Sequence, residues 1–168
     1  MRSQDTTGRD TWNFFDAPKR LSLSDFLREA RLQHANMVSA LAAMRRTNEL
    51  LHKWDTIWPD QCDYIASSLQ HIRLPIHDFA VLLGQTSRIP LPVIAPNYQV
   101  VAELNYFEVQ IQRFLTFLAP FRSISHTQSH LLFKQHLEVL QRIEETIYDG
   151  EEIIYQIDVW LDSLEPQV

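Results

Sequence analysis

The sequence contains little cysteine, little glycine and no long apolar run. Cys62 is the single cysteine among the 168 residues, which excludes a disulfide within the chain and favours a reducing, cytoplasmic environment. With three glycines, the chain lacks the turn-forming residues typical of an all-β protein. Apolar runs such as residues 79–83 fall far short of the ~18 residues that cross a bilayer. We therefore expect no contact with a membrane.

Positive charge is scarcer than negative charge. Fifteen Lys and Arg residues are outnumbered by 21 Asp and Glu residues, which gives a formal net charge of −6. Non-specific binding of nucleic acid requires clustered cations, so nucleic acid is not an expected partner. Residues 143–168 hold eight acids and no Lys or Arg, whereas residues 1–56 hold nine bases and seven acids. We expect these two parts of the chain to pair, with Arg28 and Arg31 lying near Glu151, Glu152 and Asp158.

What the sequence does contain is apolar residues at steps of three and four, the spacing of one face of an α-helix. Prolines interrupt this pattern in residues 85–96. The pattern predicts an all-α fold, an antiparallel up-down-up-down four-helix bundle with long first and last helices. The second helix should be kinked near Pro75, whose ring removes one backbone hydrogen bond. The predicted helices cover residues 22–57, 60–83, 97–121 and 125–164.

Residues 1–20 differ from the rest of the chain. They are polar, include Gly8 and Pro18, and show no helical period, so we expect a flexible N-terminal arm ahead of a bundle domain that spans residues 21–168. Three aromatic side chains in this arm form a cluster that either docks on a partner or folds back onto the surface of the bundle. These are Trp12, Phe14 and Phe15.

The last helix carries two seven-residue series that predict its buried seam. One series begins at Phe133 and ends at Leu161, and the other runs from His136 through Gly150 to Leu164. An antiparallel register places Thr47 in one layer with His136, where we expect a hydrogen bond within the core. Gly150 indicates either a close approach of helices or, as we prefer, a local bend.

Unequal helix lengths lead to a prediction about partners. The first and last helices extend about 18 Å beyond the other two, so apolar residues there have no second or third helix to pack on. Either the apolar loop of residues 89–94 covers them, or the surface stays open for a protein partner or a second copy of the chain. The predicted partner-binding residues are Phe26, Leu27, Ile89, Leu91, Ile153, Trp160, Leu161 and Leu164.

Histidines suggest one alternative, a metal-binding bundle. His126 and His130 lie one helical turn apart, a spacing that can hold a metal. The chain has the Glu-x-x-His spacing only once, from Glu49 to His52, and so lacks the two such motifs of di-iron bundles, and scattered histidines are more often solvated or capping groups. The predicted bundle gathers further groups at the same end, namely His52, Asp60, Cys62 and Asp63.

A second alternative comes from the seven residues Arg46 to His52, RTNELLH. They resemble the motif of arginine, four to six residues and histidine found in the HEPN ribonucleases, which are also helical bundles. The resemblance implies a dimer in which Arg46 binds the scissile phosphate and His52 acts as acid or base. Residues six apart lie on different faces of a regular helix, which opposes this interpretation.

No glycine-rich phosphate loop, paired thiols or nucleophile elbow occurs in the sequence. We therefore predict no catalytic residues, no cofactor and no metal. The predicted function is that of a non-enzymatic helical-bundle protein–protein interaction module, an assembly or regulatory subunit that binds a protein partner or forms a homo-oligomer.

Overall fold

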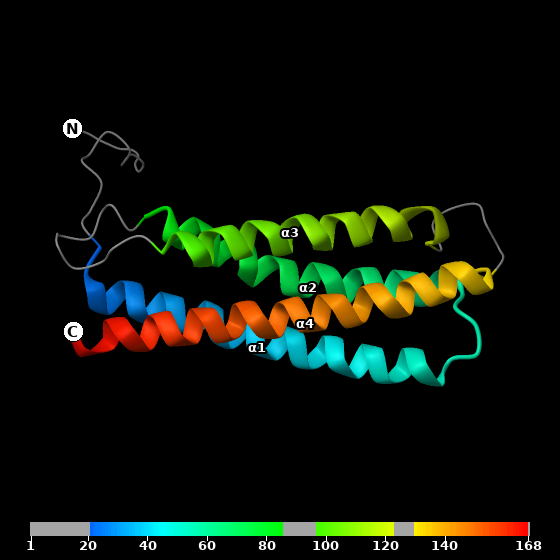
Figure 1. The fold of residues 1–168 in the computed structure, drawn as a ribbon, viewed down its shortest axis with the longest axis horizontal. Helices are drawn as coiled ribbons and strands as arrows, with labels where there is room; N and C mark the ends of the chain where they lie inside the picture. The colour runs from blue at the N-terminus through cyan, green and yellow to red at the C-terminus, as the bar shows by residue number, and fades with distance from the viewer. Residues whose placement is uncertain (1–20, 86–96, 123–129, 168) are drawn as a thin grey trace, which may run out of the picture.

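The computed structural model describes residues 21–85, 97–122 and 130–167, and these residues form four long helices and no strand (Figure 1). The all-α class is therefore confirmed. Two short 3-10 helices follow the third and fourth long helices, at Ala119–Phe121 and Glu165–Gln167. The long helices are α1 (Leu23–Lys53), α2 (Pro59–Leu83), α3 (Tyr98–Leu118) and α4 (Phe133–Leu164).

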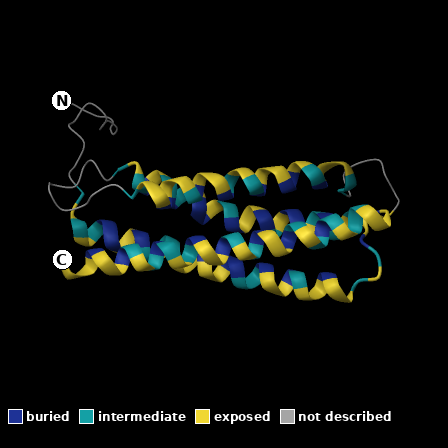
Figure 2. Cartoon of the chain, in the orientation of Figure 1, coloured by how far each residue is buried: buried dark blue, intermediate teal, exposed yellow. Residues whose placement is uncertain are grey.

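The four helices pack against one another around one core. Helix α1 contacts α2 and α4, and α3 contacts the same two helices from the other side. The start of α1 and the end of α4 lie at the same end of the molecule (Figure 1). Buried positions follow the facing sides of the helices (Figure 2). Within the described residues, no helix combines the length and the apolar content needed to cross a bilayer.

Two helix starts agree with the sequence pattern. The Ser22 hydroxyl accepts a hydrogen bond from the backbone N–H of Asp25 at 3.0 Å, which confirms Ser22 as the cap of α1. The side chain of Asn97 accepts a hydrogen bond from the N–H of Val100 at 3.1 Å and caps α3. Helix α2 begins one residue earlier than predicted, at Pro59, because proline is well suited to the first helical position.

Helix α4 begins later than predicted. The residues from His130 to Leu132 are not helical, and the backbone N–H of Leu131 donates to the carbonyl of Ile57 at 2.8 Å. This hydrogen bond ties the segment to the connection between α1 and α2, so the helix starts only at Phe133. The predicted cap, Ser125, lies outside the described residues.

The seam of α4 differs from one of the two predicted series. Phe133, the first member of one predicted series, is 78% exposed. The second series agrees better, except that His136 at its start is only half-buried. The buried positions of α4 are Val139, Ile143, Thr146, Gly150, Ile153, Ile157, Leu161 and Leu164.

Thr47 is buried, but its partner is on α2. Its hydroxyl lies 3.1 Å from the carbonyl of Ala43, to which it donates, and 3.2 Å from the Ser68 hydroxyl. The predicted hydrogen bond with His136 is therefore wrong. The threonine links α1 to α2 instead of α1 to α4.

Gly150 marks a close approach of three helices. Helix α4 continues through this residue. A Cβ atom at position 150 would lie 2.8 Å from Cδ1 of Leu41 on α1 and 3.4 Å from Cζ of Phe107 on α3. Of the two predicted alternatives, the structure supports close approach, because a side chain here would occupy space that neighbouring helices already fill.

The predicted pairing of basic and acidic segments is partly confirmed. Arg31 on α1 forms ion pairs with Asp158 and Asp162 near the end of α4, at 2.7 and 2.5 Å, and with Glu165 just beyond it, at 3.0 Å. Arg45 pairs with Glu151 at 2.6 Å. Arg28 instead pairs with Asp25 on its own helix at 2.6 Å, one turn earlier.

Candidate functional site

The predicted partner-binding residues lie mainly in the interior. Trp160 is partly buried, and its ring packs edge-on against Phe26 with 6.0 Å between the ring centroids. Ile89 and Leu91 lie outside the described residues. The others are buried, each with at most 6% of its surface exposed: Phe26, Leu27, Ile153, Leu161 and Leu164.

This burial leaves no open apolar surface at these five positions, and the loop of residues 89–94, which one alternative placed over them, lies outside the described residues. An open apolar surface would leave the ring of Phe26 in solvent, whereas that ring is fully buried. A partner could reach these side chains only if this end of the bundle opened. Their direct role in binding therefore stays a prediction, and an exposed surface has to be sought elsewhere.

The groups of the metal alternative interact with separate neighbours. His52 lies 3.2 Å from Glu144, Asp63 pairs with Arg122 at 2.8 Å, and the ring of His130 packs on Trp58. His126 is outside the described residues. In the described part of the chain, no three His, Cys, Asp or Glu side chains are grouped closely enough to hold a metal ion.

Cys62 is fully buried in the core, and burial raises the pKa of its thiol to about 12, with Asp63 and Asp60 adding to the effect. Because only the thiolate is nucleophilic, we expect native protein to resist iodoacetamide at pH 8. Intact-mass spectrometry should show no adduct before unfolding and one adduct per chain in guanidinium chloride. Rapid modification of the native protein would contradict the buried position.

The residues of the ribonuclease alternative lie on different sides of α1. Arg46 lines a groove between α1 and α2 together with His71 and Asp78. His52 instead lies beside Glu144 on α4. A single chain therefore does not bring Arg46 and His52 to one phosphate.

Helix α4 carries a second apolar face, directed away from the core. Phe133 is 78% exposed, Tyr148 69% and Tyr155 63%. The spacings between the members of this face are close to whole numbers of helical turns, so the side chains share one side of the helix over about 39 Å. We call this face the outer stripe, and exposed positions recur along α4 in Figure 2. Its members are Phe133, Leu137, Tyr148, Tyr155 and Val159.

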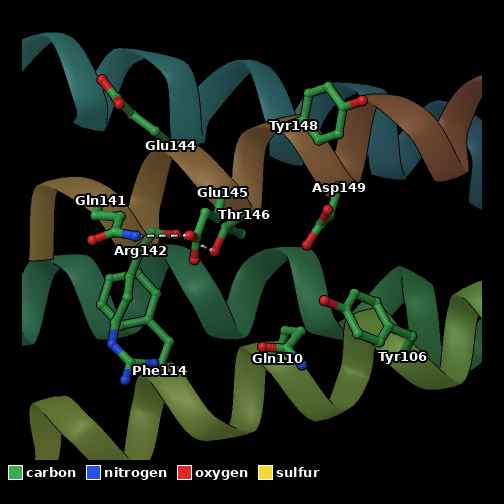
Figure 3. Close-up of a pocket in the computed structure, with 10 residues that line it drawn as sticks. All are labelled: Tyr106, Gln110, Phe114, Gln141, Arg142, Glu144, Glu145, Thr146, Tyr148 and Asp149. Carbon is green, nitrogen blue, oxygen red and sulfur yellow. Dashed lines mark hydrogen bonds between the residues drawn. The ribbon is translucent and has the colours of Figure 1, made fainter. Parts of the chain in front are cut away.

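The outer stripe borders a groove between α3 and α4 with a volume of about 460 Å³, which we call the α3/α4 groove (Figure 3). Tyr106 from α3 and Tyr148 from α4 stand at one end, each more than half exposed. Asp149 lies with them at this end of the groove (Figure 3). Towards the start of α4 the groove continues as a second hollow of about 490 Å³, which Arg113 and Lys134 line.

The end of the groove near the tyrosines is acidic. Burial raises the pKa of Asp149, and the nearby charges of Glu145 and Glu103 raise it further. Glu145 accepts a hydrogen bond from Gln141 at 3.1 Å. Among the described residues, no Lys or Arg forms an ion pair with Glu103, Glu145 or Asp149. The groove therefore combines two accessible aromatic rings with uncompensated negative charge.

A positively charged side chain, Arg142, lies at the opposite end of the groove. Arg142 pairs with Glu138 at 2.7 Å, and its guanidinium carbon lies 4.8 Å from the ring centre of Phe117. This arrangement fixes Arg142 away from Asp149. The charge along the groove thus changes from negative near Asp149 to mixed in the second hollow, where Arg113 and Lys134 lie with Glu138 and Glu145.

Comparison of the chain with known protein families, with curated proteins and with solved structures found no match. The candidate site is therefore assigned from the geometry of the structure alone. Sequence reasoning missed it because Phe133 was assigned to the seam. The available signal was the seven-residue step from Tyr148 to Tyr155, which lies outside both buried series.

Proposed function

We propose that the chain is a cytoplasmic, non-enzymatic protein–protein interaction module, an assembly or regulatory subunit that contacts its partner through the outer stripe. The observation that carries this proposal is the exposure of large apolar side chains along one side of α4. Exposed polar residues such as Gln141 and Glu144 separate the members of the stripe, which therefore forms a row of apolar anchors along one side of a helix, a pattern by which helices commonly bind partners. Tyrosines are also common among the residues that dominate interface energies.

The proposal assumes an antiparallel up-down-up-down bundle. The order of the contacts between α1 and α4 supports this topology, because later residues of α1 pair with earlier residues of α4. Arg31 pairs with Asp158, Arg45 with Glu151, and His52 with Glu144. Helix α2 continues through Pro75, and the kink there stays a prediction.

Site-specific photo-crosslinking tests this function. The photoreactive residue p-benzoylphenylalanine would replace Tyr155 in the full chain, expressed in the cells from which the protein comes. We expect one defined crosslinked protein, because Tyr155 lies on the proposed contact surface. A second copy of the chain would be recognised by a product of twice the 19.7 kDa mass.

The matched control places the same residue at Gln70, an exposed polar position on α2. A crosslink obtained from position 155 and absent from position 70 supports the proposal. Equal products from both positions, or none from position 155, would reject it. A further variant, Phe133→Ser with Tyr148→Ser, should abolish the crosslink at position 155 while leaving the helical circular dichroism signal unchanged.

A further inference from the structure

The α3/α4 groove restricts the chemistry of what can occupy it. Tyr106 and Tyr148 are each more than half exposed, Asp149 lies at their end of the groove, and Glu145 lines the groove one helical turn of α4 earlier. An ammonium or guanidinium group placed there would gain from both the carboxylates and the rings. An anionic group would be repelled.

A two-fold contact between copies of the chain that is centred on the tyrosine end of the groove fits this surface poorly. In a two-fold contact between α4 helices centred near Tyr148, the acids around that residue would face the same acids of the other copy. Glu145, Asp149 and Glu152 would then meet like charges, which is destabilising. The same negative charge opposes a nucleic acid. Charge complementarity therefore favours a basic segment of a different protein.

The shape of the groove indicates the form of that segment. The groove and its continuation run beside α4 from Asp149 to Lys134, about 22 Å at 1.5 Å per residue. A helix of about 15 residues has this length, and amphipathic helices commonly bind in grooves between helices. The outer stripe beside the groove supplies the apolar surface that such a helix would cover.

We propose that the α3/α4 groove binds a basic amphipathic helix of a protein partner, with a Lys or Arg side chain held between Tyr106 and Tyr148 against Glu145 and Asp149. This inference rests on the proposed function and names the chemistry of the partner. The basic half of the bound helix lies near Asp149, and its other half lies near Arg113 and Lys134.

The test uses two fluorescent synthetic helices of about 15 residues with the same leucine stripe, one flanked by lysines and the other by glutamates. We expect the lysine peptide to bind the full chain in fluorescence anisotropy, with an affinity that falls as salt is raised, and the glutamate peptide not to bind. The double variant Glu145→Gln, Asp149→Asn should weaken binding of the lysine peptide by about tenfold or more.

The matched control is Glu29→Gln with Glu49→Gln, which removes the same charge from exposed positions on α1. This variant should bind the lysine peptide as the unaltered chain does. The groove variant should retain its thermal midpoint or gain stability, because it removes acids that repel each other. Failure of the lysine peptide to bind, equal binding of the glutamate peptide or an equal loss in the control would overturn the inference.

The outcome of the peptide-binding assay can be distinguished from the outcome of the photo-crosslinking assay that tests the proposed function. A partner crosslinked from Tyr155 together with no binding of the lysine peptide would leave the function standing and reject the basic helix. Specific binding of the lysine peptide without any crosslink would reject the cellular interaction proposed for the outer stripe and keep the chemistry of the groove.

Discussion

Replacing Phe26 with alanine is expected to lower the free energy of unfolding by about 3–5 kcal/mol. The ring is fully buried and packs edge-on against Trp160, 6.0 Å away between centroids. Its removal would leave a cavity between α1 and α4 that the surrounding side chains fill only partly. Urea unfolding followed by circular dichroism measures the change.

Leu32→Ala provides the control on the same helix. Leu32 is 50% exposed, so its replacement should change the free energy of unfolding by no more than about 0.5 kcal/mol. A Phe26→Ala variant that keeps full stability but loses its partner would show that Phe26 is an open anchor, as the predicted overhang required. The pair of variants therefore distinguishes packing from binding at this end of the bundle.

The local features of the fold were predictable from sequence because they depend on neighbouring residues. The three-four spacing of apolar residues identified the four helices, the cap at Ser22 followed from a short polar pattern, and the start of the third helix was expected near Asn97. The buried series through Ile143, Gly150 and Ile157 was also predictable. Each of these features is set within a few turns of one helix.

The start of α4 was not predictable in this way. The helical pattern extends back to Ser125, but the backbone of Leu131 bonds to Ile57, more than 70 residues earlier. A tertiary hydrogen bond of this kind overrides the local pattern. The exposure of Phe133 follows from it, because the residue now stands at the end of the helix instead of within the seam.

The charge pattern of the groove could not be predicted without knowing the register between the helices. Glu103 and Asp149 belong to different helices, and only their packing brings them close enough to raise the pKa of Asp149. The sequence indicates an acidic segment but not which acids lack a cation. Arg31 and Arg45 pair with acids that face α1, whereas Glu145 and Asp149 in the α3/α4 groove have no such partner among the described residues.

The acids and tyrosines of the groove leave charge repulsion and exposed ring surface in the isolated chain. Mutual repulsion between Glu145 and Asp149 is destabilising, and the rings of Tyr106 and Tyr148 remain in contact with water. A bound basic helix would remove both penalties at once. The same residues that weaken the free protein are therefore those expected to contribute most to binding.

Gly150→Leu is expected to lower the free energy of unfolding by about 2–3 kcal/mol. The first side-chain atom would lie 2.8 Å from Cδ1 of Leu41 and 3.4 Å from Phe107, and both neighbours are buried. The helices would have to separate to admit the rest of the leucine. The gain in helix propensity on replacing glycine, about 1 kcal/mol, offsets only part of this strain.

A double-mutant cycle shows whether the close approach is the cause. Gly150→Ala should be nearly neutral, because its single methyl group displaces only the end of the Leu41 side chain while the helix gains propensity. Leu41→Ala alone should destabilise by about 2–5 kcal/mol, but combined with Gly150→Leu it should cost at least 1 kcal/mol less than the sum of the two single changes. The new leucine would then fill the space that Leu41 vacates. Simple additivity of the two changes would mean that residues 41 and 150 do not share this space and that α4 accommodates a side chain at position 150 by another route.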